Sequence, residues 1–305
     1  MNHSTDILSL SGQLCLQKQK IVIHIINSNS DKNSQSKHIF RMKTISFISL
    51  FLFLFVAVSC NQPQRDSEWI QLFNGEDLTG WTPKIRGFEA GYNFANTFRV
   101  EDGLLKVRYC PVAYERFQYR FGHIFFEQPF SHYILRVTYR IVGNQVPGAP
   151  GWAYRNSGIM IHGQTPESMT LNQDFPTSIE VQLLGRSARY QRRTTANLCL
   201  PGTRVVINDA LSTQHCINST LEAPLYDEWM TIELEVRGNE VIRHIHNGEV
   251  VMEYFQPQLN RNHHYFAKLY ALNGNDVMLH GGTISLQSEG HPIDFKVVEI
   301  KVLEP

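Results

Sequence analysis

The sequence predicts an all-β protein, built as an antiparallel sandwich or jelly roll of two sheets. Many short segments alternate apolar and polar residues, which is the period of a strand with one buried face. Turn-forming pairs with Gly, Asn or Asp separate these segments at regular intervals. No sustained helical period follows the apolar leader, and aromatic residues make up 11% of the chain. Together these observations favour a sandwich over a helical or mixed fold.

The charge of the chain is balanced and gives no reason to expect nucleic acid as a partner. The 305 residues include 28 Lys and Arg and 28 Asp and Glu, and the isoelectric point is near 7.2. A basic patch or tail would be needed to attract a phosphate backbone. Residues 69–305 are enough for one large domain with its own core.

Residues 42–60 have the features of a lipoprotein signal peptide. Positive charge at Arg41 and Lys43 precedes an apolar run over residues 45–58, and small residues lead directly to Cys60. This ending resembles a bacterial lipoprotein cleavage box, so we expect Cys60 to be lipidated and to anchor the protein in the cell envelope. A transmembrane anchor is the alternative, but the run is shorter than the roughly 20 residues a spanning helix needs.

The segments on either side of the signal peptide show no periodic pattern of apolar residues that would predict helices or strands. Residues 1–41 are polar, yet a signal peptide belongs at the start of a chain. We therefore expect that the start codon is assigned too far upstream and that translation begins at Met42. Residues 61–68 read as a tether between the lipidated cysteine and the domain.

The first half of the domain contains three clear segments. A hairpin is predicted over residues 98–109, with Asp102-Gly103 as its turn. Residues 133–142 alternate strongly and predict a strand, and residues 143–152 are rich in Gly and Pro and predict a loop.

Two alternating strands at residues 157–163 and 177–185 form the centre of the chain. Each has an apolar face, made by Ile159 and Ile161 in the first and by Ile179, Val181 and Leu183 in the second. On the opposite faces of the two strands, the side chains of His162, Glu180 and Gln182 are expected to form one patch. Buried imidazole and carboxylate groups are costly unless they are paired or used, so this patch is the candidate active site. A solvated sheet face is the alternative interpretation.

The second half continues the same pattern of strands and turns. Residues 186–197 are polar and basic and predict a surface loop. A three-strand meander follows at residues 231–236, 241–246 and 249–254, and closing strands are predicted at 283–287 and 295–302.

Three cysteines fall within the domain, and two of them bracket one loop. Exported proteins fold in an oxidising space, so a Cys199–Cys216 disulfide is plausible and would hold the loop between them beside the site. A zinc site is the competing interpretation, but the spacing includes no C-x-x-C pair.

Several segments occur in an order that resembles a known family. In chain order they are LFNGEDLTGW, VEDGLLKV, RNSGIMIHG, IEVQLLG, DEWMTIELEV, HNGEVVMEY, GGTISLQSEG and IDFKVVEIKV. The set resembles the 3-keto-disaccharide hydrolase domain family, which is common in Bacteroidetes lipoproteins. The resemblance implies a concanavalin A-like jelly roll with a carbohydrate site on its concave face. The resemblance extends to family members that carry the NLCLPGT…HC segment, and it implies a Cys199–Cys216 disulfide.

The resemblance also shows one departure from the wider lectin and glucanase superfamily. Its retaining glucanases place carboxylates at alternating positions of one strand, whereas this strand has Glu180, Gln182 and Leu184. Retaining hydrolysis needs two carboxyl groups about 5 Å apart. This strand alone cannot supply them, which argues against double displacement.

The family name instead implies a substrate already oxidised at C3 of a sugar. The ketone acidifies the C2 hydrogen, so one base can start an elimination that expels the aglycone from C1. Glu180 or His162 is the expected base. Arg155, Asn156 and Gln182 are expected to donate to the enolate or to hold sugar hydroxyls. A divalent metal could also polarise the ketone, with His162, Glu180 and His280 as ligands.

A second polar cluster follows the strand at residues 283–287. Gln287, Glu289 and His291 are expected to bind substrate, because polar residues at strand ends often form sugar sites, although a plain turn is the alternative. Trp152 could stack on a sugar ring. The sequence therefore predicts a carbohydrate-active enzyme that cleaves glycosidic bonds. A carbohydrate-binding lipoprotein without turnover is the second hypothesis.

Overall fold

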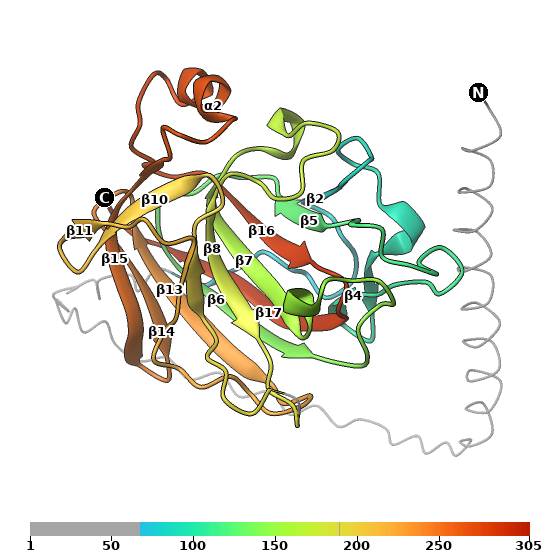
Figure 1. Cartoon of the computed structure of the whole chain (residues 1–305). Coiled ribbons are helices and arrows are strands. Elements are labelled where there is room, and N and C mark those ends of the chain that lie inside the picture. The colour runs from blue at the N-terminus through green and yellow to red at the C-terminus, as the bar shows by residue number, and fades with distance from the viewer. Residues whose placement is uncertain (1–67, 189) are drawn as a thin grey trace, which may run out of the picture.

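The computed structural model describes residues 68–188 and 190–305. Two antiparallel sheets pack against each other in this part of the chain (Figure 1). The all-β, two-sheet jelly-roll sandwich predicted from the sequence is confirmed. The predicted N-terminal extension, signal peptide and Cys60 lie outside the described residues. Within residues 68–188 and 190–305, no helix is long and apolar enough to cross a membrane.

One sheet has ten strands in the described chain. Its spatial order is β11 (Ala210–Leu211), β10 (Thr203–Ile207), β15 (Glu249–Leu259), β14 (Val241–His246), β13 (Met230–Arg237), β6 (His132–Ile141), β17 (Ile293–Val302), β4 (Leu104–Val107) and β3 (Phe98–Glu101), with β1 (Ile70–Gln71) paired to β17. The predicted meander is the run β13–β14–β15, and the predicted hairpin is β3–β4.

The other sheet has seven described strands and carries the central stretch of the sequence. Its order is β12 (Cys216–Ile217), β9 (Asn197–Cys199), β8 (Ile179–Leu184), β7 (Asn156–Gly163), β16 (Thr283–Ser288), β5 (Gly122–Phe126) and β2 (Trp81–Ile85). Figure 1 shows β8, β7, β16 and β5 side by side. Strand β16 is far from β5 and β7 in sequence, yet it lies between them.

In the part of the chain that the structure describes, helical segments are short and lie outside the sheets. The α-helix α2 (Phe266–Leu272) is followed by the return of the chain into β16. It has seven residues, which is too short to leave a sustained helical period in the sequence. Three 3-10 helices are Phe94–Asn96, Gly151–Ala153 and Pro166–Ser168.

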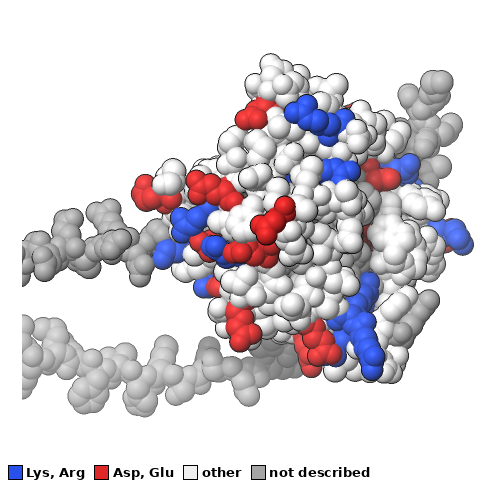
Figure 2. Space-filling view, turned by 60° about the vertical axis from the view of Figure 1, so that its left-hand side comes forward, with Lys and Arg blue, Asp and Glu red and all other residues white. Residues whose placement is uncertain are grey.

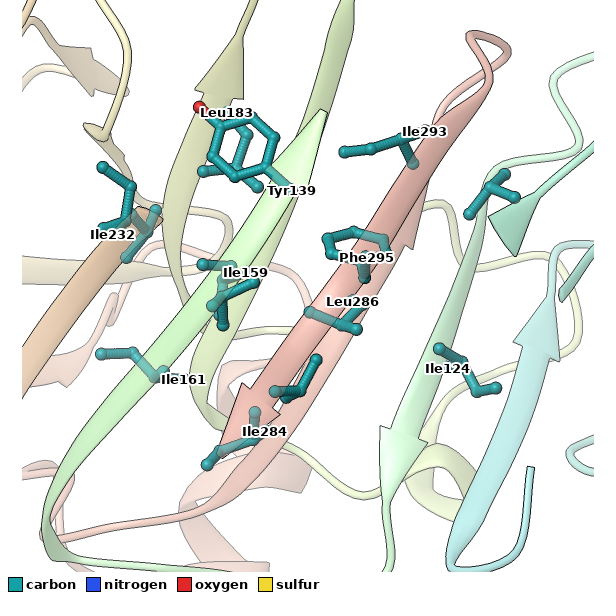
Figure 3. Packing of buried hydrophobic residues seen from close by; sticks show 14 of the residues in the cluster. Ile124, Tyr139, Ile159, Ile161, Leu183, Ile232, Ile284, Leu286, Ile293 and Phe295 are labelled. Carbon is teal, nitrogen blue, oxygen red and sulfur yellow. The ribbon is translucent and has the colours of Figure 1, made fainter. Parts of the chain in front are cut away.

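The core fills the space between the inner faces of the two sheets (Figure 3). Ile159, Ile161 and Leu183 come from the seven-stranded sheet, and Tyr139 and Phe295 come from the ten-stranded sheet. All five side chains are fully buried. Because strand side chains alternate, this inward set fixes which residues of β7 and β8 point away from the core.

The far face of the ten-stranded sheet carries paired charges. Arg136 bonds to both Glu233 and Glu299, and Arg243 bonds to Glu235 and Glu253. Figure 2 shows acidic and basic side chains interspersed on the face in view. Opposite charges on neighbouring strands support the sheet at its solvent side.

Candidate active site

The outer face of the seven-stranded sheet, which points away from the core, carries a row of polar residues. Ile159 pairs with Val181 on the inner face, so the next pair, Gly158 and Gln182, points outward. The same register continues across neighbouring strands. In order from β2 to β9 the row is Lys84, His123, Gln287, Gly158, Gln182 and Asn197.

The carboxyl group of Glu180 leans over Gly158 in this row. A methyl group at Gly158 would lie 2.9 Å from Oε1 of Glu180 and 3.2 Å from Oε1 of Gln287. Real Cβ contacts are essentially never shorter than 3.0 Å. The absence of a side chain at Gly158 therefore leaves the space in which Glu180 and Gln287 meet.

Glu180 is removed from solvent and holds its proton unusually tightly. It is 6% exposed, and burial raises its pKa from 4.5 to about 8. Contact with the Gln287 amide opposes this rise in the pKa, although neither carboxamide atom of Gln287 makes a hydrogen bond of normal geometry. A carboxyl group with such a pKa can give or take a proton near neutral pH.

A second buried carboxyl group, Glu289, lies within electrostatic range of Glu180. It is 3% exposed, and burial raises its pKa well above the usual range. The charge of Glu180 raises the pKa of Glu289 further, and Arg193 opposes the rise. Two neighbouring carboxyl groups in a low-dielectric site favour a state with a single negative charge. A second carboxyl group, absent from the strand of Glu180, therefore comes near it from the residue that follows β16.

Several buried polar atoms around these carboxyl groups have no hydrogen-bond partner in the described protein. They include both ring nitrogens of His123, both carboxamide atoms of Gln287, Oδ1 of Asn156 and Oε2 of Glu289. Buried polar atoms in folded proteins are nearly always paired. These atoms give the outer face around the carboxyl groups a buried polar lining with incomplete hydrogen bonding.

A cavity of about 370 Å³ adjoins the same face. Leu184 and Asn197 line it from β8 and β9, and Arg193 lines it from the preceding loop. Nδ2 of Asn197 donates to Oε1 of Gln182 over 3.2 Å. Cavities of this size hold small ligands, and Asn197 both lines this one and contacts Gln182 of the polar row.

His162 does not join this cluster, and its predicted position beside Glu180 is wrong. Its backbone φ is +50°, and the pairing of β16 with β7 shifts register next to it. Nε2 of His162 lies 2.9 Å from the carbonyl of Gly238, in the turn between β13 and β14. The bulge turns the ring toward the ten-stranded sheet, because an extra residue breaks the strict alternation of a strand.

Arg155 and Trp152 lie near the outer face but have different surroundings. The Arg155 guanidinium donates to the carbonyls of Ile141 and Tyr226 and is therefore engaged in holding loops together. Trp152 is 54% exposed and stacks on Phe121 with ring centroids 5.7 Å apart. Its free surface is available for stacking on a ligand.

His291 lies beside the carboxyl cluster, next to Tyr154. The two rings are 5.4 Å apart in an edge-to-face arrangement. Burial, followed by the charge of Arg155, lowers the pKa of His291 to about 4. The ring is neutral at physiological pH and can donate or accept a hydrogen bond.

The predicted disulfide is confirmed. Cys199 and Cys216 are joined with an S–S distance of 2.02 Å. They pair across β9 and β12 at the edge of the seven-stranded sheet. On its other side Cys199 pairs with Glu180, so the disulfide fixes the strand next to the central carboxyl group.

Four residues of the polar row, Lys84, His123, Gly158 and Asn197, were not predicted as site residues, and Asn197 begins β9 instead of ending a surface loop. His123 is fully buried, and burial followed by the charge of Lys84 lowers its pKa to about 3. Nζ of Lys84 donates to the carbonyls of Ile85 and Leu171 over 3.3 and 3.1 Å. The available signal was a polar residue next to a buried isoleucine, Lys84 before Ile85 and His123 before Ile124. Each strand has only five residues, however, which is too few to establish a period.

The described residues do not fit the predicted divalent metal. Among residues 68–188 and 190–305, no three His, Cys, Asp or Glu side chains gather in a group that could hold one. His162 and His280 interact near Gly238, whereas Glu180 lies over Gly158 on the outer face.

Comparisons with known proteins identify a family model and several structures. The model described as the 3-keto-alpha-glucoside-1,2-lyase-like domain matches residues 68–301. A search of curated proteins finds no match. A candidate glycosyl hydrolase from Parabacteroides distasonis ATCC 8503 has 15% identity and a TM-score of 0.47, covering 77% of this chain and 100% of its own. Bacillus licheniformis β-glucanase has 11% identity and a TM-score of 0.43, covering 79% and 100%.

The family match covers most of the chain, whereas the likeness to the two solved structures is low. Both TM-scores are below one half, so these likenesses carry no argument about activity. The family model, in contrast, spans most of the chain and agrees with the ordered segments from LFNGEDLTGW to IDFKVVEIKV. The chain therefore belongs to the family of 3-keto-alpha-glucoside-1,2-lyase-like domains.

Proposed function

We propose that this domain cleaves the glycosidic bond of glycosides that carry a ketone at C3, by elimination across C1 and C2. The observation that carries the proposal is the buried pair Glu180 and Glu289, surrounded by polar atoms without partners. Family membership supports the substrate class. The pair supports enzymatic turnover, because binding alone gives no reason to bury two interacting carboxyl groups.

Glu180 acts as the base in this mechanism. Its pKa of about 8 leaves a fraction of Glu180 ionised near neutral pH, and the charge of that fraction raises the pKa of Glu289, so the reactive state holds one carboxylate and one carboxylic acid. The carboxylate of Glu180 takes the C2 proton, which the neighbouring ketone has made acidic. The electron pair of the C2–H bond forms an enolate and then the C1–C2 double bond, as the C1–O bond breaks.

Glu289 supplies the matching acid. It retains its proton in the singly charged pair, and it can transfer this proton to the departing glycosidic oxygen. The amide of Gln287 and the neutral ring of His123 offer unpaired N–H groups on the same face. Such donors stabilise a developing enolate oxygen in a buried site far better than in water.

The experiment compares a 3-keto glycoside with its unoxidised parent, using purified protein. We expect turnover of the keto compound alone, with an enone product visible by its ultraviolet absorbance. Deuterium at C2 should slow the reaction, because the C2–H bond breaks in the elimination. Cleavage of both glycosides without an isotope effect would instead show ordinary hydrolysis. Tight binding of sugar without any product would show a carbohydrate-binding protein.

A further inference from the structure

The cavity of about 370 Å³ beside the outer face of the seven-stranded sheet is lined by two arginines, Arg192 and Arg193. We call it the arginine cavity. Leu184 and Asn197 line it from the sheet, and the other lining residues come from the chain just before β9 and just after β12. The two arginines therefore border a space that is large enough for a small ligand.

The positive charge of these arginines is not balanced within the cavity. Glu222 also lines it, but the carboxylate of Glu222 is paired with Arg186. Within residues 68–188 and 190–305, neither Arg192 nor Arg193 forms an ion pair with a carboxylate. A guanidinium that is partly withdrawn from water and lacks such a partner favours an anionic ligand.

The guanidinium of Arg193 is half-buried and held in place by its neighbours. Its Nη1 donates to the carbonyls of Tyr154 and Gly185 over 2.6 and 3.4 Å. Its central carbon lies 5.2 Å from the ring centroid of Tyr190. These contacts fix the side chain, and the hydrogen bonds use Nη1, so the Nε and Nη2 donors remain for a ligand. A guanidinium binds carboxylate, sulfate or phosphate oxygens through such a pair of donors.

The arginine cavity lies next to Glu289. Strands β16 and β7 pair in a register that, carried one residue past β16, sets Glu289 beside Asn156. Asn156 pairs with Leu184, which lines the cavity. The charge of Arg193 also lowers the pKa of Glu289, and charges interact appreciably only over short distances. The cavity and this carboxyl group are therefore neighbours.

We propose that the arginine cavity binds an anionic group on the aglycone of the substrate, a carboxylate, sulfate or phosphate. This inference rests on the proposed function, in which Glu289 protonates the departing glycosidic oxygen. The aglycone is attached to that oxygen, so it extends from Glu289 into the neighbouring cavity. While Glu289 holds its proton it gives Arg193 no counter-charge, and the anionic group of the aglycone supplies one.

The test compares two 3-keto glucosides whose aglycones are 4-carboxyphenyl and 4-carbamoylphenyl. The carboxamide has the shape of the carboxylate without its charge. The value of kcat/KM is measured for both glucosides, and calorimetry gives the Kd of the two free phenols, 4-hydroxybenzoate and 4-hydroxybenzamide. Arg193→Gln and Arg192→Gln each remove one charge from the lining. Arg261→Gln is the matched control, because Arg261 is exposed and lies outside the arginine cavity.

We expect the wild type and Arg261→Gln to prefer the carboxylate over the carboxamide by the same factor. Arg193→Gln should reduce this preference about 10- to 100-fold, which is the usual effect of losing a hydrogen bond between charged groups. Arg192 is exposed, so Arg192→Gln should reduce it only about two- to fivefold. Added salt should weaken the binding of 4-hydroxybenzoate more than that of 4-hydroxybenzamide.

The outcomes separate this inference from the proposed function. Binding of 4-hydroxybenzoate that depends on Arg193, without turnover of either glucoside, would support the site and contradict the proposed reaction. Turnover of both glucosides with no charge preference in the wild type would overturn the site and leave the reaction standing. This wild-type comparison decides even if Arg193→Gln fails to fold. A stronger dependence on Arg193 for a phenyl 3-keto glucuronide would place the anion on the sugar and overturn the assignment to the aglycone.

Discussion

Glu180 and Glu289 lie on the same sheet, and the charge of Glu180 raises the pKa of Glu289. Glu180 is the second residue of β8, and Glu289 directly follows β16, two strands away. Burial is the largest cause of the raised pKa in both, and the charge of Glu180 adds to the rise at Glu289. This relationship allows one residue to act as a base while the other acts as an acid.

Glu180→Gln should abolish most turnover of a 3-keto glycoside without unfolding the protein. The amide keeps the shape of the side chain but cannot accept the C2 proton. Loss of a general base typically costs about 10²–10⁴-fold in rate. Glu253→Gln, on the exposed far face of the other sheet, is the control and should react at the wild-type rate. Normal turnover by Glu180→Gln would remove this residue from the mechanism, and a collapsed melting temperature would give it a structural role.

The same substitution should stabilise the protein at alkaline pH. The pKa of Glu180 rises from 4.5 in the unfolded chain to about 8 in the fold. Between these values the folded protein holds a proton that the unfolded chain has lost, so stability falls as the pH rises. The amide in Glu180→Gln does not titrate, so the variant lacks this fall in stability with pH. Its melting temperature relative to wild type should therefore be higher at about pH 8 than at about pH 5. A difference that does not change with pH would contradict the raised pKa.

Much of the fold follows from local pattern. Alternation in residues 133–142 and in the meander predicts β6 and β13–β15, because side chains on a strand have a period of two. The same rule places Glu180 and Gln182 on the face opposite Ile179 and Val181. Strands β2 and β5 were missed, since each has only five residues, which is too few to establish a period.

The composition of the site is harder to predict because it depends on long-range pairing. Glu289 approaches Glu180 only because β16 inserts between β5 and β7, and no local pattern encodes that neighbour. His162 was misplaced because alternation assumes a regular strand. The positive φ at His162 and the adjacent register shift reverse its direction, and a residue with a side chain gives no sequence signal for such a conformation.

Cys60 remains a predicted lipidation site. The apolar run of residues 45–58 and the small residues before Cys60 are the basis of this prediction. Radiolabelled palmitate should enter the wild type in a bacterial host and should not enter Cys60→Ala. The variant should also leave the membrane fraction, since lipid chains supply the anchor. Equal labelling of both proteins would show that Cys60 is not the acceptor.

Removing the Cys199–Cys216 disulfide should destabilise the domain. The two cysteines are 17 residues apart, and closing a loop of that length contributes roughly 3 kcal/mol in the chain-entropy model. The double variant Cys199→Ser/Cys216→Ser should show this loss in denaturant unfolding at equilibrium. Reducing the wild type should produce at least as large a loss, because Cys110 is also disulfide-bonded. An unfolding free energy equal to that of the wild type would contradict the expected contribution.

Gly158→Ala should disable the site at little cost in stability. The new methyl group would lie 2.9 Å from Oε1 of Glu180 and 3.1 Å from its Cγ, so the carboxyl group must move. The neighbouring atoms belong to side chains that can rotate, and the backbone need not shift. A displacement of about 1 Å at a catalytic group can cost on the order of 100-fold in rate. We therefore expect a large fall in kcat with a nearly unchanged melting temperature.

Gly151→Ala is the matched control for this glycine. A methyl group there meets nothing within 4 Å, so it adds the same atoms without contact and should leave kcat unchanged. The direction of the Glu180 displacement can be read from the pH dependence of the stability difference between Gly158→Ala and wild type. If the methyl group pushes the carboxyl toward solvent, its pKa falls and stability declines less between about pH 5 and about pH 8. Full activity of Gly158→Ala would mean that the carboxyl over Gly158 is not the group that takes the proton.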